Sequence, residues 1–328
     1  MSEATDPGID PARERYVLHR RFDRLGRLVG DDAMQRLLGS HAMVIGLGGV
    51  GSWAAEMLVR SGVGRVDLVD FDQVCITNVN RQVHALVGTI GQFKATALAE
   101  RLAKINPQAR IEGIIGFYDR ERGGALLDRG APYVIDAIDS ITHKAHLLHA
   151  CLARGIRVVC ATGSGGRLDP TQVRTGDLAA TRGDPLARAV RKILRLKYGF
   201  RKKLDFGIPA VHTLEPAREP LDLGYDRGKG FGCVCPQGLD RPFSCEARRR
   251  IYGTAGFVTA AMGQAAAALV VRAIAGDYAW PAPQERRAIP VDVGLDEEPG
   301  CEHEHTSACE HTAAAVAGHG PTMSDERG

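Results

Sequence analysis

Short apolar runs in this chain alternate with segments whose apolar residues recur every three or four positions. Residues 42–46 (AMVIG) form a short apolar run that ends in glycines, and residues 65–70 (RVDLVD) form another. Between them, residues 51–61 place a mainly apolar set on one helical face: Trp53, Met57, Leu58 and Ser61. This pattern predicts a β-α-β unit, with buried parallel strands around an amphipathic helix.

The same alternation continues to about residue 161. It predicts helices over 92–105, around 123–127 and over 142–153, and strands over 110–115, 133–138 and 157–161. Alternating strands and helices are typical of a mostly parallel sheet covered by helices on both faces. We therefore expect a Rossmann-like α/β fold.

The pattern weakens after Gly163, where strands are expected only near residues 172–175 and 208–214. This irregular half is expected to pack against the first, giving one domain over residues 15–285. Residues 296–328 are polar and small and are expected to form a disordered tail. The tail carries candidate metal ligands, but no visible scaffold fixes their geometry: Cys301, His303, His305, Cys309 and His311.

Composition narrows the class of protein. The 328 residues are 44% hydrophobic and 25% charged, as in soluble globular proteins. The N-terminus has no signal-peptide pattern, and eight irregularly spaced cysteines fit reduced thiols, so a cytoplasmic protein is expected. The apolar run 254–271 contains Gln264 and two glycines, which favours a helix in the core or in a subunit interface over a membrane span.

A glycine loop follows the first predicted strand. Residues 46–51 (GLGGVG) satisfy the G-x-G-x-x-G pattern, in which backbone N–H groups can approach a phosphate at a helix N-terminus. Asp70 ends the next strand, at the distance where an acid receives ribose hydroxyls. The loop therefore predicts an adenine nucleotide, whether mononucleotide or dinucleotide.

A polar cluster beyond Asp70 favours ATP over a nicotinamide dinucleotide. Asn78, Arg81 and Lys94 are donors for which the sequence offers no acceptors, and an arginine can grip phosphate oxygens with two N–H groups. Asp139 is expected to end another parallel strand, where its carboxylate could hold Mg²⁺ between phosphates. Asp136 falls on the opposite face of that strand and is expected to be structural.

These residues, in this order, resemble the superfamily of ubiquitin-activating enzymes and their bacterial relatives ThiF and MoeB. The shared pattern covers roughly residues 20–165 and implies ATP-dependent adenylation of a carboxylate. By that resemblance the catalytic residues are Arg81, Lys94 and Asp139, with Asp139 also carrying Mg²⁺. The implied nucleotide-binding residues are Gly46, Gly48, Gly49, Gly51, Asp70, Asp72, Asn78, Arg81 and Lys94.

The closer resemblance is to one branch, the tRNA threonylcarbamoyladenosine dehydratases. It extends from about residue 21 to 187, through blocks such as DQVCITNVNRQVHA and YVIDAIDS. The branch is implied to adenylate the threonyl carboxylate of a modified adenosine beside the anticodon, after which the carbamoyl group closes a ring and AMP leaves. The resemblance also implies a homodimer, in which Arg21, Arg24 or Arg27 would reach the partner's ATP.

A basic segment supports an RNA partner independently of the resemblance. In residues 188–203 (RAVRKILRLKYGFRKK) eight of sixteen residues are Lys or Arg, with Tyr198 and Phe200 interleaved. A phosphate backbone is a natural partner of such a run, although Val190, Ile193, Leu194 and Lys197 also fit a core-facing stripe. The net charge of +3 alone is too small to identify a nucleic-acid binder.

Two other functions remain open at this point. The first is activation of a ubiquitin-like sulfur carrier, possible sulfur-transfer partners included, but the paired C-x-x-C zinc motifs implied for ThiF and MoeB are absent from the sequence. The second is an NAD-dependent oxidoreductase, against which the Asn78, Arg81 and Lys94 cluster argues. Ring closure needs no thiol, and the sequence does not rank the candidate cysteines: Cys75, Cys160, Cys233, Cys235 and Cys245.

Overall fold

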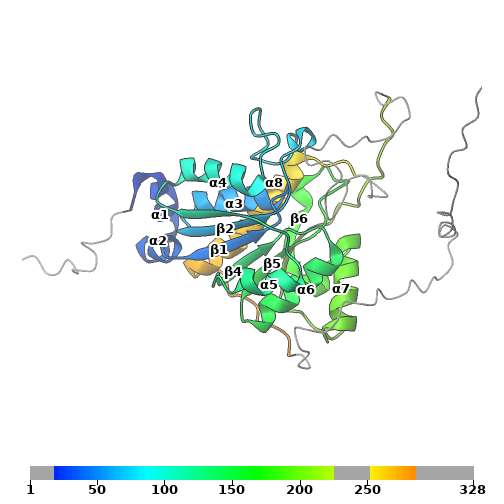
Figure 1. Cartoon of the computed structure of the whole chain (residues 1–328). Helices are drawn as coiled ribbons and strands as arrows, with labels where there is room; N and C mark the ends of the chain where they lie inside the picture. Colours follow the sequence, from blue (N-terminus) through cyan, green and yellow to red (C-terminus); the bar gives the residue numbers. More distant parts are fainter. Residues whose placement is uncertain (1–17, 225–251, 286–328) are drawn as a thin grey trace, which may run out of the picture. The chain divides into compact units, whose positions relative to one another are not determined.

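A seven-stranded sheet organises the chain (Figure 1). The structure is a computed structural model that describes residues 18–224 and 252–285. The chain divides into residues 1–291 and 292–328, and the second unit, with the expected tail 296–328, lies outside the described residues.

The strand order is β3-β2-β1-β4-β5-β7-β6, and every neighbouring pair is parallel except β6 with β7. The predicted strands all form, including the two in the irregular half. Their bounds are β1 His41–Ile45, β2 Arg65–Asp70, β3 Arg110–Ile115, β4 Tyr133–Asp136, β5 Arg157–Ala161, β6 Val173–Asp177 and β7 Pro209–Thr213.

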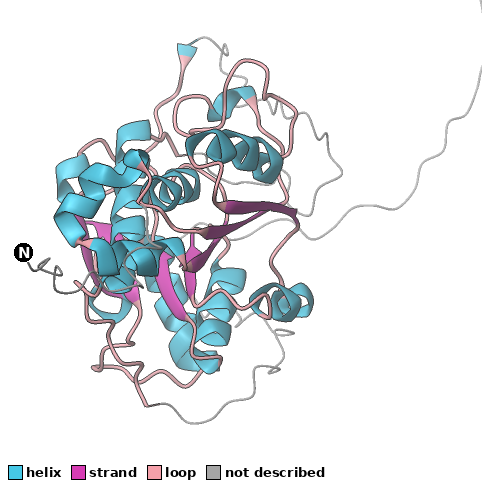
Figure 2. Cartoon of the chain, turned by 90° about the vertical axis from the view of Figure 1, so that its left-hand side faces the viewer, coloured by secondary structure: helices cyan, strands magenta, loops and turns pink. Residues whose placement is uncertain are grey.

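Helices cover both faces of the sheet, which confirms the predicted fold class (Figures 1 and 2). In Figure 1, α3, α4 and α8 lie on one side of the sheet and α5, α6 and α7 on the other. The bounds are α1 Asp23–Val29, α2 Asp31–Leu38, α3 Gly51–Arg60, α4 Lys94–Ile105, α5 Arg120–Leu127, α6 Ile141–Ala153, α7 Pro185–Lys197 and α8 Gly256–Ala275.

The two large core clusters follow from the alternation of side chains along each strand. In β1, Ala42 and Val44 pack with α2, α3, α4 and α8, whereas Met43 and Ile45 pack with α6 and α7. All four side chains are buried, because helices cover both faces. A strand buried on both faces reads as a continuous apolar run, as residues 42–46 do.

The apolar run 254–271 forms α8, which lies in the core. α8 is long and apolar enough to cross a membrane, yet its most apolar window is 56% buried and the helix packs against α3 and β5. Leu269, Val270 and Ile274 belong to the core cluster on that face. Of the two sites predicted for this helix, the structure therefore places it in the core.

The strand order reverses between β1 and β4, and this fixes where a ligand can bind. The chain runs from β1 outward to β2 and β3, then returns to place β4 on the other side of β1. In open α/β sheets ligands bind outside the carboxyl ends of the strands at such a switch point. The loops that follow β1 and β4 are those that carry the glycines and Asp139.

At the opposite, amino-terminal end of the strands, Asp67 forms a buried ion cluster. Its carboxylate lies 3.2 Å from His41 Nε2, 3.3 Å from Arg65 Nε and 2.7 Å from Arg129 Nε. Burial alone would raise the pKa of Asp67, but hydrogen bonds with His41 and Arg129 outweigh it and hold that pKa well below its usual range. This cluster is structural.

Candidate nucleotide-binding site

The glycine loop is held against the segment that follows β4. Gly46 has φ +88°, and a Cβ there would lie 2.7 Å from Ala137 O. At Gly51 a Cβ would lie 1.8 Å from Gly46 O, so neither position accepts a side chain without moving the backbone. Gly49 is tight against Thr259 of α8, whereas a Cβ on Gly48 would meet nothing within 4 Å. Gly48 is thus the glycine at which a ligand can approach the backbone.

Asp70 joins the glycine loop to the end of β2. Its Oδ2 accepts from Leu47 N at 2.6 Å and its Oδ1 accepts from Asp72 N at 2.8 Å. An ionised carboxylate offers about four acceptor positions, so each oxygen can accept a further bond from a ribose hydroxyl. Burial raises the pKa of Asp70, and the nearby ammonium of Lys94 opposes that effect.

The segment between Asp72 and Lys94 is a loop whose two ends are joined by backbone hydrogen bonds. Lys94 N donates to Asp72 O at 2.9 Å, and Val74 N donates to Gln92 O at 2.8 Å. At its closed end, Lys94 Nζ lies 2.7 Å from Asp72 Oδ2. The loop therefore returns the first residue of α4 to the end of β2, beside Asp70.

Lys94 is a buried, charged lysine. It is 7% exposed, and burial acts to lower its pKa, but attraction to Asp70 and Asp72 outweighs burial and raises it. The prediction that Lys94 lacks an acceptor is wrong, because its Nζ lies 2.7 Å from Asp72 Oδ2. The carboxylates of Asp70 and Asp72 also offset the cost of a cation at the N-terminus of α4. A bound phosphate would have to share the Lys94 ammonium with Asp72 or displace Asp72 from it.

Arg81 and Asn78 also have partners within the loop. Arg81 Nη1 donates to Thr77 O at 2.8 Å and to Asn80 Oδ1 at 3.0 Å. Asn78 is buried, and its Oδ1 accepts from Cys75 N at 3.0 Å, which fixes the amide so that Nδ2 remains as the expected donor. The backbone of Arg81 lies beside α3, since its carbonyl accepts from Trp53 Nε1 at 3.1 Å.

Asp139 lies beyond the end of β4 rather than in it. The strand ends at Asp136, whose Oδ1 accepts from Ile138 N at 3.1 Å and so turns the chain. Asp139 is exposed in the connection to α6 at the carboxyl edge. Asp136 is fully buried on an ion pair with Lys144 at 2.9 Å, in agreement with its predicted structural place.

Sequence reasoning missed two buried cations behind this edge. Lys144 of α6 pairs with Asp136, and the available signal was an acid inside an apolar strand, which requires a counter-charge. Arg167 is 3% exposed and donates to Gly163 O and Gly165 O, both at 2.9 Å, and to Asp184 at 3.2 Å. Arg167 thereby fixes the loop after β5, and no spacing in the sequence points to those acceptors.

The thiols of the described residues are poor nucleophile candidates. Cys75, Cys151 and Cys160 are all buried. Burial raises the pKa of Cys160 to about 12 and that of Cys151 well above its usual value. The part of the chain that the structure describes holds no group of three His, Cys, Asp or Glu placed to bind a metal. The other candidates fall outside the described residues: Cys233, Cys235, Cys245, Cys301, His303, His305, Cys309 and His311.

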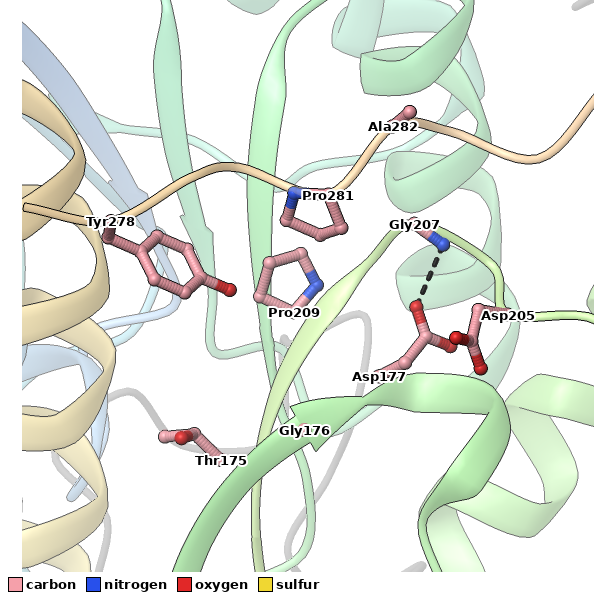
Figure 3. Close-up of a pocket in the computed structure, with 9 residues that line it drawn as sticks. All are labelled: Thr175, Gly176, Asp177, Asp205, Gly207, Pro209, Tyr278, Pro281 and Ala282. Carbon is pink, nitrogen blue, oxygen red and sulfur yellow. Dashed lines mark hydrogen bonds between the residues drawn. The ribbon is translucent and has the colours of Figure 1, made fainter. Parts of the chain in front are cut away.

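A separate hollow of about 470 Å³ lies between β6, β7 and the chain after α8 (Figure 3). Gly207 in its lining precedes β7, so the hollow is at the end of the sheet opposite the glycine loop. The Asp177 carboxylate there accepts from the backbone N–H groups of Ala179, Phe206, Gly207 and Ile208. This carboxylate is structural, and the candidate site remains the carboxyl edge.

The chain matches the ThiF family over residues 22–292. It is 39% identical over 246 residues to a tRNA threonylcarbamoyladenosine dehydratase of Escherichia coli, covering 74% of this chain and 89% of that protein. It is 45% identical over 216 residues to the protein of the same name from Bacillus subtilis, covering 66% and 82%. The crystal structure of the E. coli dehydratase TcdA in complex with ATP aligns with a TM-score of 0.67 and 34% identity, over 80% of this chain and 98% of that chain.

These matches confirm the resemblance that the glycine loop, the polar cluster and the YVIDAIDS block predicted. The family match spans every described strand, from β1 to β7, and α8 as well. The chain belongs to the ThiF family.

Proposed function

We propose that this chain is an ATP-dependent tRNA threonylcarbamoyladenosine dehydratase. The observation that supports the proposal is the Asp70 carboxylate, which bonds to the glycine loop and lies near the Lys94 ammonium at the carboxyl edge, where Asp139 also follows β4. This chain aligns with most of the length of relatives of that name, and one of them was crystallised with ATP.

In the proposed reaction, an oxygen of the threonyl carboxylate attacks the α-phosphate of ATP and pyrophosphate leaves. The neighbouring carbamoyl group then bonds to the activated carbonyl carbon, gives up a proton, and AMP leaves. The nucleoside loses one water in total. Because the second step is intramolecular, the protein has mainly to orient the groups and stabilise developing charge.

The nucleotide would lie along the carboxyl edge. Its phosphates would face Gly48 and the N-terminus of α3, and its ribose would bond to Asp70. Arg81 and Lys94 would neutralise the triphosphate, with Asp72 releasing or sharing Lys94 as the phosphate binds. Asn78 would contribute its Nδ2 and hold the turn that carries Arg81.

Magnesium fits this donor set. Mg²⁺ is ordinarily bound by one or two carboxylates together with substrate phosphates and waters. Asp139 supplies one exposed carboxylate at the edge where the phosphates would lie. When bound, the metal would neutralise charge on the phosphates, and the role of Asp139 is to orient it there.

We also propose that the enzyme is a homodimer in which an N-terminal arginine reaches the partner's site. α1 and α2 precede β1 and pack at the amino-terminal end of the strands, away from the glycine loop of the same chain. Arg21 bonds to Asn106 and Arg27 to Asp23, whereas Arg24 forms no hydrogen bond to any described residue. Arg24 is therefore the candidate for this contact.

Replacing two glycines separately should distinguish ligand contact from loop structure. Gly51→Ala should prevent the loop from closing and lower both stability and ATP affinity, because its Cβ meets Gly46 O. Gly48→Ala should leave thermal stability within a few degrees of wild type yet weaken ATP binding about tenfold or more, since its Cβ enters the space a phosphate would use. Calorimetric titration with ATP and thermal melts check both; unchanged ATP affinity in Gly48→Ala would place the phosphates elsewhere.

The basic segment presents a cationic face along α7. Ala187, Val190 and Leu194 are buried beneath it, so the core-facing stripe and the basic surface coexist. Tyr198 and Phe200 also belong to the core and are not part of the basic surface, which limits the predicted interleaving of aromatics. The exposed cations are Arg188, Lys192, Arg201, Lys202 and Lys203.

The double variant Arg188→Gln/Lys192→Gln should weaken tRNA binding and reduce its salt dependence. Each lost phosphate contact lowers the slope of log affinity against log salt by about 0.7–0.9, so a total change of about 1.5 is expected. The matched control is Lys104→Gln/Arg110→Gln, two exposed cations at α4 and β3 on the far edge of the sheet. Equal slopes for both double variants would make α7 an ordinary solvated face.

Nucleoside mass spectrometry tests the proposed function directly. Threonylcarbamoyl-modified tRNA is incubated with the protein and Mg²⁺, with and without ATP. Loss of one water from the nucleoside only with ATP is the expected result. An unchanged nucleoside, with ATP consumed when small carrier proteins are supplied, would move the chain to the sulfur-carrier activating enzymes of the same family.

A further inference from the structure

A fully buried lysine lies directly behind the candidate site. Lys144, on the second turn of α6, has a side chain with no exposed surface. Its Nζ lies 2.9 Å from Asp136 Oδ2, 3.3 Å from Asp136 O and 2.9 Å from Ile138 O. The Lys144 ammonium therefore donates to two backbone carbonyls and forms an ion pair with one carboxylate, all on residues 136–138.

The two carbonyl acceptors belong to the backbone that leads to Asp139. The Ile138 carbonyl precedes Asp139 directly, and Asp136 Oδ1 accepts from Ile138 N at 3.1 Å. Lys144 therefore holds the segment by the carbonyls of Asp136 and Ile138, and the Asp136 side chain holds it by the Ile138 amide. Asp139 itself is exposed beyond this grip.

The same segment touches the glycine loop. Ala137 N donates to Ile45 O at 2.9 Å, and Ala137 O occupies the space where a Cβ on Gly46 would stand. A shift of the segment after β4 would thus move the Asp139 carboxylate relative to the loop that faces the phosphates. Lys144 links α6 to this segment and, through it, to the glycine loop.

Stability alone is a weak explanation for this ion pair. Taking a lysine and an aspartate fully out of water is costly, and well-packed apolar residues of the same size often give equal or greater stability. What apolar residues lack is a charged group that donates to two carbonyls and attracts one carboxylate at the same time. Burial acts to lower the pKa of Lys144, but attraction to Asp136, with a smaller contribution from Asp139, raises it, so the donors stay charged.

We infer that Lys144 is a positioning residue for Asp139, holding residues 136–138 so that the Asp139 carboxylate meets the metal on ATP bound at the glycine loop. The inference rests on the proposed function and adds to it a residue that touches neither nucleotide nor metal.

The test compares ATP affinity with Mg²⁺ and ATP affinity in EDTA, measured by calorimetric titration of the full-length protein. Lys144→Met keeps the volume and removes the donors. It should weaken binding of ATP with Mg²⁺ about 10- to 100-fold, the usual effect of losing a group that orients a metal ligand. Affinity in EDTA should change much less, because the glycine loop, Asp70 and Lys94 remain.

A double-mutant cycle identifies the route of the effect. If Lys144 acts through Asp139, adding Lys144→Met to Asp139→Ala should cause no further loss of the Mg²⁺-dependent affinity. Additive losses would overturn the inference. The control is Asp67→Asn, which weakens a buried ion cluster at the opposite end of the strands and should lower stability without altering the Mg²⁺ effect.

Asp136→Asn/Lys144→Met covers the case in which Lys144→Met does not fold, because it leaves no buried charge unpaired. It should fold and show the same loss of the Mg²⁺ effect; a full Mg²⁺ effect in either variant would overturn the inference. Wild-type protein without any Mg²⁺-dependent gain in ATP affinity would instead remove both the inference and the proposed site.

Discussion

Replacement of Asp139 by asparagine is expected to reduce ATP–pyrophosphate exchange by about 100- to 1,000-fold, the scale set by removal of one preorganised charge-stabilising group. Exchange would be measured with threonylcarbamoyl-modified tRNA present, since an acyl-adenylate must form. The magnitude is large because Asp139 would be the one protein carboxylate on a metal otherwise held by phosphates and water. Asparagine keeps the shape but removes the charge that orients the metal.

The fold should survive this substitution. Asp139 is exposed beyond the grip of Lys144 on residues 136–138, so thermal stability should stay near that of wild type. Asp119 provides the matched control, because it follows β3 at the same edge and caps α5 by accepting from Arg122 N at 2.7 Å. Asparagine also caps helices well, so Asp119→Asn should keep exchange activity. Undiminished exchange in Asp139→Asn would remove Asp139 from the site.

The parallel part of the sheet was predictable because its strands are short, apolar and closely bounded by helices. The bounds of β2 and β3 agree with the sequence prediction to the residue, and α6 begins one residue earlier than expected. The strand over 133–138 was predicted too long. β4 ends at Asp136 because that side chain caps a turn, which periodicity cannot register.

The edge at which the site forms was also predictable, since carboxyl ends of parallel strands share one edge. Which groups pair there was not. Lys94 reaches Asp72 only because backbone hydrogen bonds join the two ends of the loop between them. Arg81 donates to the carbonyl of Thr77, within the same loop. The spacing of residues in the sequence identifies hydrogen-bond donors, but only the folded loop shows which of these donors already have an acceptor within the protein.

The same limit applies to α7. Its charge density was evident in the sequence, and so was a stripe that could face the core. Tyr198 and Phe200 look equally suited to stack on bases or to pack inside, and the structure buries both. Their burial follows from packing against α6 and Phe206: Tyr198 stacks on His149 with ring centres 4.4 Å apart, and Phe200 lies 4.7 Å from Phe206.

Removal of the Lys94 charge is the second change with a large expected effect. Lys94→Met should lower the free energy of unfolding by about 3–5 kcal/mol, because it leaves the Asp70 and Asp72 carboxylates without their cation. Burial already raises the pKa of Asp70, so the folded variant should gain protons more readily than the unfolded chain. The loss of stability should therefore be largest above the folded pKa of Asp70 and shrink as the pH falls through it. Denaturant titrations at several pH values check this.

The variant Asp72→Asn/Lys94→Met separates the structural role of Lys94 from its proposed role on the triphosphate. Removing both members of the pair that lies 2.7 Å apart leaves the buried Asp70 carboxylate without its cation, so only part of the lost stability should return. ATP affinity should not return, because no other cation would replace the ammonium beside Arg81, and exchange should stay about 100-fold below wild type. Recovery of both stability and ATP affinity would show that Lys94 serves only to hold the loop, and would leave Arg81 as the sole triphosphate cation of the proposal.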